Sequence, residues 1–444
     1  MVKRRQPSAH EAAATAIEER RDGHGDAGNR QGYIKRAHDR EQARERARQR
    51  MRRRRKLALW TGPVVLAVAF GGIGAYVASP AWAERVVQEV PTTFVFPGVA
   101  PRLPWPAAGQ AGLSVAGIGD LGTSGAVATP VPIASVAKVM TAYQVLTDHP
   151  LAVGQDGPAI TVTRDEAAAY ARQVAVNESV VPVTNGEKLT ERQALQALML
   201  ASAGNVALIL ARWDAGSVDA FLTRVGATAA HLGMTHSTYT DPSGLDRGTV
   251  STAPDQLLLA RAAMSRPAFA EIVAEKSAVI PVAGAIRNFN TLLGQDGVIG
   301  VKTGSTLAAG GCLMFAADVP LGSSTQRAQR LLRVYGIVLG QQGTSSTILP
   351  HALTAAQRLV AAARSTLGTA TVAQSGSRVA VVRRTLHDDR ILAPANDVQV
   401  VGWPGLTYTM RVSGPPSAPL LTVAPANSAS AASAAGYTVV SVLK

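Results

Sequence analysis

The chain has 444 residues, which is enough for two or more domains with a sizeable core each. Its formal net charge of +14 is concentrated in the first 56 residues, which hold 18 Lys and Arg against 8 Asp and Glu, whereas the other 388 hold 26 against 22. This distribution excludes a basic nucleic-acid-binding groove in the folded part, so no nucleic-acid partner is expected.

Residues 1–56 are predicted to be a basic cytoplasmic tail, and residues 57–79 a transmembrane helix. The tail is nearly free of large apolar residues, so it cannot bury enough surface to fold alone and is expected to be disordered or transiently helical. No charged residue occurs from Leu57 to Ala83. At ~1.5 Å per residue, a helix over this segment spans the ~30 Å hydrocarbon core of a bilayer.

The charges on the two sides of the apolar segment predict its orientation. The Arg-rich side is expected to stay in the cytoplasm, which makes this a single-pass protein of the cell membrane with the residues after Glu84 outside. A cleaved signal peptide is the alternative, because "AWA" at 81–83 resembles a cleavage site. The region before it is far longer than an ordinary n-region, which favours an uncleaved anchor.

Residues 80–109 are predicted to be a Pro-rich linker, because repeated prolines sustain neither a helix nor a central strand. Residues 110–368 have the pattern of a globular domain, with a capping box at Thr190 and Gln193. Helices in the middle and strands at both ends predict an α+β fold with a mostly antiparallel sheet. Helices are expected over 135–147, 187–213 (two helices), 218–233, 252–265 and 348–367, and strands over 113–119, 297–305, 310–318 and 331–340.

Residues 369–444 are predicted to be a small all-β module, since short β-branched runs alternate there with Pro, Gly and Ser. No metal site or cofactor is expected, because His231 and His236 lack the spacing of a metal-binding helix. The single cysteine, Cys312, can form no intrachain disulfide and is predicted to be a small core residue.

Two stretches share the pattern S-x-x-K, "SVAK" at Ser135–Lys138 and "SVLK" at Ser441–Lys444. In a helix, residues i and i+3 share a face, so Ser135 and Lys138 can meet. The second stretch reads as a strand, in which the two side chains point to opposite sides. Only the first pair is therefore predicted to combine a serine nucleophile with a lysine base.

The scarcity of lysine supports this choice, because only 8 of the 44 basic residues are Lys. A buried lysine can lose its proton and act as a base, whereas arginine stays charged. Lys138 precedes an apolar run that would lower its pKa by burial, and Lys302 begins "KTG" on a predicted strand. Ser135 is expected near a helix N-terminus, where main-chain N–H groups stabilise developing negative charge.

The motifs "ASVAKVMTAY", "LMLASAGN", "TDPSGL" and "GVKTGSTLAAGGCLMFAA" occur in this order. With them the chain resembles the D-alanyl-D-alanine carboxypeptidases, the low-molecular-mass penicillin-binding proteins of serine peptidase family S11, over about residues 110–365. The resemblance implies a β-lactamase/transpeptidase-like domain, an antiparallel sheet with a helical subdomain. It implies membrane-anchored removal of the terminal D-Ala from peptidoglycan stem peptides, and covalent inhibition by β-lactams.

The resemblance also implies roles for individual residues. Ser135 attacks the substrate carbonyl and Lys138 takes the serine proton. The N–H groups of Ser135 and Ser305 form the oxyanion hole. The other substrate-binding residues that it implies are Lys302 and Thr303 at the terminal carboxylate and Gly304, which lets the strand come close enough to pair with the peptide.

The second motif departs from the Ser-x-Asn of the family. Ser202 aligns with the serine that passes a proton to the leaving group, but Gly204 occupies the Asn position and Asn205 comes one residue later. A bulge at Ala203–Gly204 would let Asn205 reach the substrate, and it is predicted to do so. Without that bulge, activity is expected to be low or absent.

Two alternative functions remain open at this stage. A related β-lactamase or esterase-type serine hydrolase has the same first and third motifs, although no Glu-x-x-x-Asn is present to position a deacylating water. A catalytically weak or inactive cell-wall scaffold would be consistent with the displaced Asn and the added C-terminal module.

Overall fold

The computed structural model describes residues 51, 67–68, 84–176, 178–321, 330–384, 388–426 and 435–442. The chain divides into two units, 1–83 and 84–444, and the architecture below is that of the second. The predicted tail (1–56) and transmembrane helix (57–79) lie almost entirely outside the described residues. Within the ranges that are described, no helix is both long and apolar enough to cross a bilayer.

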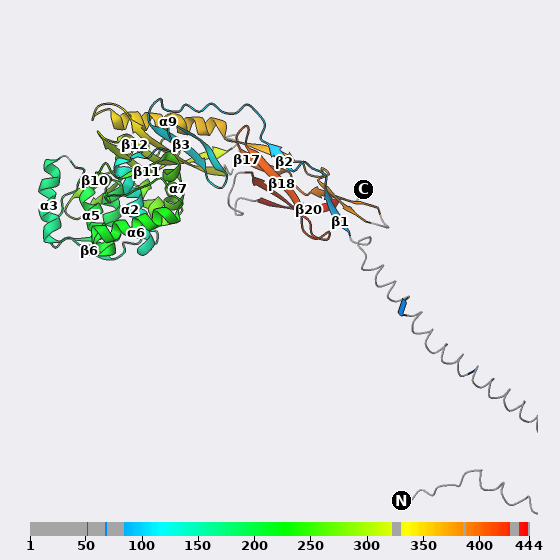
Figure 1. Cartoon of the computed structure of the whole chain (residues 1–444), viewed down its shortest axis with the longest axis horizontal. Helices are drawn as coiled ribbons and strands as arrows, with labels where there is room; N and C mark the ends of the chain where they lie inside the picture. Colours follow the sequence, from blue (N-terminus) through cyan, green and yellow to red (C-terminus); the bar gives the residue numbers. More distant parts are fainter. Residues whose placement is uncertain are drawn as a thin grey trace, which may run out of the picture. The chain divides into compact units, whose positions relative to one another are not determined.

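An antiparallel sheet forms the centre of this unit, and its five strands in the described residues have the order β11-β12-β13-β3-β4 (Figure 1). Strands from the start of the domain therefore lie beside strands from its end, as the sequence predicted. β11 is an edge strand with β12 as its partner in this sheet. The strands are β3 (Gln110–Val115), β4 (Gly119–Ser124), β11 (Val298–Thr306), β12 (Gly310–Leu321) and β13 (Arg330–Gln341).

The two faces of the sheet are covered by different helices: α9 packs on one face, and α2, α7 and α8 contact the other, with α5 and α6 packed against α2 (Figure 1). Alternate residues of β12 enter two separate cores: Cys312, Met314 and Ala316 face the helical layer, and Leu313 and Phe315 face α9. Cys312 is fully buried, as predicted. The helices are α2 (Lys138–Asp148), α3 (Arg164–Ala175), α4 (Glu191–Met199), α5 (Gly204–Ala215), α6 (Val218–His231), α7 (Ala253–Met264), α8 (Pro267–Ala274) and α9 (Ile348–Thr366).

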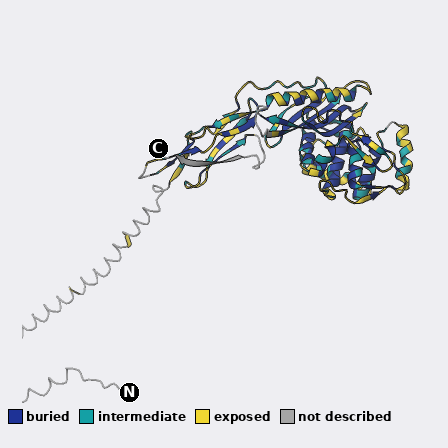
Figure 2. Ribbon diagram, turned by 180° about the vertical axis from the view of Figure 1, so that it is seen from behind, coloured by how far each residue is buried: buried dark blue, intermediate teal, exposed yellow. Residues whose placement is uncertain are grey.

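Local sequence signals set the ends of several helices. The Thr190 side chain accepts the N–H of Gln193 while the Gln193 side chain accepts the N–H of Thr190, so the predicted capping box of α4 is confirmed. α3 differs from the other helices because none of its residues is buried, and Figure 2 shows its largely exposed surface. Short two-stranded pairs connect the helices: β5 (Val131–Pro132) with β8 (Val250–Ser251), β6 (Ala159–Thr161) with β7 (Lys188–Thr190), and β9 (Ser277–Ile280) with β10 (Gly284–Arg287).

A second sheet, whose seven strands in the described residues have the order β1-β15-β16-β20-β19-β18-β2, combines both ends of the unit. The structure here differs from the predicted linker 80–109, because β1 pairs with β15 and β2 pairs with β18. The strands are β1 (Arg85–Gln88), β2 (Thr93–Val95), β15 (Ala380–Arg383), β16 (Arg390–Pro394), β18 (Thr407–Ser413), β19 (Leu420–Pro425) and β20 (Ala435–Val442), with β14 (Gly368–Ala373) and β17 (Val398–Gly402) as a separate pair.

The prolines near β1 and β2 did not prevent pairing, because both strands lie at edges of the sheet, where an unpaired backbone is tolerated. Gln88 links β1 to β18 through its side chain: its amide donates to the carbonyl of Met410 and accepts the N–H of Val412, both in β18. The partners of β1 and β2 are about 300 residues away in the sequence, so no local pattern indicated these strands.

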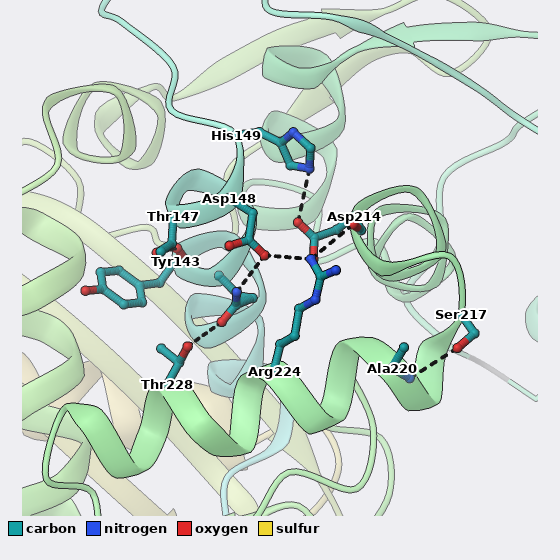
Figure 3. Close-up of polar contacts among 10 residues, drawn as sticks. Tyr143, Thr147, Asp148, His149, Asp214, Ser217, Ala220, Arg224 and Thr228 are labelled. Atoms are coloured by element: carbon teal, nitrogen blue, oxygen red, sulfur yellow. Dashed lines mark hydrogen bonds and ion pairs between the residues drawn. The ribbon is translucent and has the colours of Figure 1, made fainter.

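The C-terminal end of α2 carries a cluster of ionisable side chains (Figure 3). Arg224 lies between two carboxylates, 3.0 Å from Asp148 and 3.4 Å from Asp214, and His149 lies 3.2 Å from the other oxygen of Asp214. The His149 ring also stacks on Trp213, with centroids 4.0 Å apart. The Asp214 side chain is fully buried, and burial followed by the charge of Asp148 raises its pKa to about 7.

Candidate active site

Ser135 and Lys138 meet at the start of α2. The predicted helix begins with one turn of 3₁₀ helix, η2 (Ala134–Ala137), and continues as α2 from Lys138. Three residues per turn place positions i and i+3 directly above one another. Lys138 Nζ consequently lies 2.9 Å from Ser135 Oγ, so the structure brings the predicted nucleophile and base into contact.

The environment of Lys138 favours its neutral form. The side chain is 3 % exposed, and its Nζ donates to the carbonyl of Ser243 at 2.7 Å. Burial lowers the pKa of Lys138 to about 8, although the carboxylates of Asp241 and Glu178 act in the opposite direction. With this pKa about one Lys138 in ten is unprotonated at pH 7, and this form can accept the serine proton.

The loop that presents the Ser243 carbonyl is organised by Asp241. One Asp241 oxygen accepts the N–H and hydroxyl of Ser243 and the N–H of Leu245, and the other accepts the hydroxyl of Thr249. A Cβ at Gly244 would lie 1.9 Å from the carbonyl oxygen of Ala134, so the loop rests directly on η2. In the sequence, "TDPSGL" was only one of the motifs that carry the resemblance, although an Asp that begins a tight turn is a signal of such bonding.

The edge strand β11 supplies the third motif next to η2. A Cβ at Gly304 would lie 3.0 Å from the main-chain nitrogens of Ser135 and Val136, so glycine allows β11 to approach the nucleophile this closely. Lys302 and Thr303 are buried and Ser305 is exposed. Burial, followed by the charge of Lys138, lowers the pKa of Lys302 well below its ordinary value.

The second motif has a different arrangement from the prediction. Asn205 is 3 % exposed, and its amide is held at both ends by one residue: Oδ1 accepts the N–H of Val181 and Nδ2 donates to the Val181 carbonyl. Both polar groups of Asn205 thus make a hydrogen bond to the main chain, and the role of this side chain in substrate binding stays a prediction. It holds the segment before β7 against the start of α5.

Ser202 is buried and stands immediately before the N-terminal cap of α5. Its φ of +60° is unusual for a residue with a side chain, and among the described non-glycine residues only Ala134 (+47°) and Asp296 (+51°) share this feature. Two of these three strained residues adjoin the predicted catalytic motifs. Backbone strain of this kind is concentrated at functional sites, where it fixes side-chain direction.

Glu178, which was not among the predicted site residues, is also part of this region. Its carboxyl group occupies the space above Gly204, where a Cβ would lie 2.1 Å from Glu178 Oε1. No periodicity or motif indicated this residue, because it reaches the site from a loop more than 20 positions earlier. No group of three or more potential metal ligands occurs in the ranges covered by the structure.

Residues 119–326 match the sequence profile of the peptidase S11 family, D-alanyl-D-alanine carboxypeptidase. A D-alanyl-D-alanine carboxypeptidase of Mycobacterium tuberculosis is 38 % identical over 167 residues, which cover 36 % of this chain and 55 % of that protein. A second, from a Streptomyces species, is 33 % identical over 202 residues, or 41 % of this chain and 67 % of the relative.

The fold is also similar to a solved structure of a D-alanyl-D-alanine carboxypeptidase from Francisella tularensis. The TM-score is 0.52 at 17 % identity, with 79 % of this chain and 95 % of the other covered. At this identity the likeness concerns the fold alone.

Proposed function

The chain belongs to the peptidase S11 family of D-alanyl-D-alanine carboxypeptidases, and we propose that it removes the terminal D-Ala from peptidoglycan stem peptides through an acyl-enzyme on Ser135. The observation that carries this proposal is the 2.9 Å contact between Ser135 Oγ and the buried amine of Lys138. A nucleophile within hydrogen-bond reach of a base whose pKa is near the working pH is the requirement for acyl transfer.

In the proposed first step, neutral Lys138 takes the proton of Ser135 as its Oγ attacks the carbonyl carbon of the last peptide bond. The negative charge on the carbonyl oxygen is stabilised by the main-chain N–H groups of Ser135 and Ser305. The proton then reaches the leaving D-Ala amine by way of Lys138 and Ser202. Water hydrolyses the resulting ester and regenerates Ser135.

Strand β11 is proposed to hold the substrate peptide. An edge strand has unpaired N–H and C=O groups, so an extended peptide can add to it as one more strand. Lys302 and Thr303 bind the terminal carboxylate in this arrangement. The low pKa of Lys302 results from burial beside Lys138, so the arriving carboxylate favours protonation of Lys302.

Covalent labelling tests the proposal. Purified full-length protein is incubated with a penicillin, and its intact mass is compared with that of Ser135→Ala. We expect a penicilloyl adduct on the wild type and none on the variant, with melting temperatures showing that both are folded. Absence of the adduct on folded wild-type protein would contradict the proposed function.

Membrane anchoring by residues 57–79, with the catalytic domain outside the cell, is a separate part of the proposal. It is supported by the uncharged stretch after the Arg-rich tail. We expect the full chain to resist alkaline carbonate extraction from membranes, and a chain that lacks 57–79 to be released. Release of both would contradict the anchor.

Residues 369–444 are proposed to form an all-β module that includes the N-terminal strands β1 and β2. Limited proteolysis should then yield a stable fragment from residues 84–97 together with the C-terminal residues.

A further inference from the structure

The carboxyl group of Glu178 lies at the start of α5, beside the turn that contains Ser202. A Cβ added to Gly204 would lie 2.1 Å from Glu178 Oε1 and 3.0 Å from its Cδ, so a larger side chain at 204 would have to displace the end of the Glu178 side chain. The N–H of Gly204 donates to the carbonyl of Ser179 at 2.7 Å, which fixes the neighbouring backbone at the same place. The backbone next to Glu178 is thus fixed beside Gly204, and the Glu178 carboxyl lies over this glycine.

Glu178 also belongs electrostatically to the catalytic centre. Its charge acts on Lys138, whose amine lies 2.9 Å from Ser135 Oγ, and the charges of Lys138 and Asp241 act on Glu178. Asp241 is saturated by hydrogen bonds within its own loop. Glu178 is only half-buried, with a hydrogen bond from the Gln173 side chain, and so has acceptor capacity to offer to a ligand.

The carboxylate of Glu178 differs from an Asn side chain in the hydrogen bonds that it can make. An Asn side chain both donates and accepts hydrogen bonds, whereas an ionised carboxylate only accepts them. A substrate carbonyl opposite Glu178 would be repelled, and an N–H or an ammonium group would be attracted. Position 204 is where the resemblance to the family places an Asn, so Glu178 occupies the volume of that side chain but has different bonding properties.

We propose that Glu178 is a specificity-determining residue that contacts the substrate in place of a side chain at position 204 and favours peptides with an amine next to the cleaved D-Ala-D-Ala end. The inference rests on the proposed function. A carboxylate of this exposure should prefer the free amine by about two- to fivefold, as for a partly exposed ion pair.

Two peptides test the preference, Nα-acetyl-L-Lys-D-Ala-D-Ala and its Nα,Nε-diacetyl form, which lacks the amine. We expect full-length wild type to cleave the first with the higher kcat/KM, mainly through KM, and the preference to decline at high salt. Glu178→Gln should reduce the ratio to about one. Asp165→Asn, which removes an exposed carboxylate from α3, is the matched control and should keep the wild-type ratio.

A double-mutant cycle tests whether the Glu178 carboxyl lies over Gly204, and it does not depend on enzymatic activity. Gly204→Asn should lower the melting temperature in the wild type, where Glu178 blocks the new side chain, and should lower it less in a Glu178→Ala background. Equal losses in both backgrounds would overturn the inference. So would an unchanged peptide preference in Glu178→Gln protein that is still labelled by penicillin. Wild-type protein that is neither labelled nor active overturns the proposed function and this inference together.

Discussion

Helix α2 carries ionisable groups at both ends, and the two ends differ in how those groups are paired. At its start, Lys138 is buried against neutral oxygens, the hydroxyl of Ser135 and the carbonyl of Ser243. At its end, the buried carboxylate of Asp214 contacts Arg224 and His149. Both groups have pKa values shifted toward neutrality, mainly by burial.

The kind of partner distinguishes the proposed reactive site at Lys138 from the structural cluster at Asp214. A buried charge with opposite charges around it is held in place, and its partners compensate part of its desolvation. The amine of Lys138 has neutral hydrogen-bond partners, and the charges of Asp241 and Glu178 only partly offset its burial, so it gives up its proton more readily than an exposed lysine does. A shifted pKa therefore supports the proposed catalytic role at the start of α2, where the amine contacts the Ser135 hydroxyl, and accompanies an internal ion-pair network at its end.

The largest effect is expected from Lys138→Arg, which would make the start of α2 permanently charged. Arginine keeps its proton and cannot act as a base, so the rate of penicillin acylation should fall by about 10²- to 10⁴-fold. Time courses of adduct formation by mass spectrometry measure this. Lys276→Arg, at an exposed lysine, is the control and should react like wild type. An unaltered rate in Lys138→Arg would rule out Lys138 as the base.

The pH dependence of acylation should report the pKa of Lys138. Its neutral form is the active one, and burial lowers the pKa to about 8, so the rate should increase as pH rises and level off above that value. Below pH 8 we expect about a tenfold change per pH unit. Stopped-flow fluorescence between pH 6 and 9 measures the profile, and a rate that is constant across this range would contradict the assignment.

Removal of the carboxylate that organises the Ser243 loop should have a smaller effect. Asp241→Ala leaves the N–H and hydroxyl of Ser243 without their acceptor, which we expect to cost about 1–3 kcal/mol of unfolding free energy. Urea denaturation measures the loss, and acylation should slow because the Ser243 carbonyl no longer holds Lys138. Stability and acylation rate both equal to wild type would contradict this role.

The smallest effect is expected at the other end of α2, from Asp214→Asn. Because the pKa of Asp214 is raised to about 7, the folded state binds this proton more tightly than the unfolded state does. The associated stability is present below pH ~4 and is lost as pH rises through about 7. The wild type should therefore lose on the order of 1 kcal/mol of unfolding free energy between pH 5 and 8, and Asp214→Asn should not show this loss.

Melting temperatures at the two pH values measure this difference. Asp219→Asn, at an exposed carboxylate on α6, is the control and should show the same difference from wild type at both. If Asp214→Asn instead lost stability relative to wild type as pH rises, the ion-pair network would stabilise the ionised form of Asp214, which would contradict the raised pKa of this group.

Local sequence patterns were sufficient to predict contacts between residues that are close in the chain. The spacing of Ser135 and Lys138 predicted their contact, since i and i+3 share one face of a helical turn. The capping box at Thr190 depended on residues three apart in the same way. The segment before residue 110 was different, because the partners of β1 and β2 are at the far end of the chain.

The sequence by itself thus determined the contact between Ser135 and Lys138, the "KTG" strand and the family, because each depends on neighbouring residues or on motif order. Only the tertiary structure decided what surrounds Gly204. There the packing of separate segments engages Asn205 with Val181 and directs Glu178 into the space of the missing side chain. No local rule could indicate this, because a glycine defines an empty volume and only distant residues determine which side chain fills it.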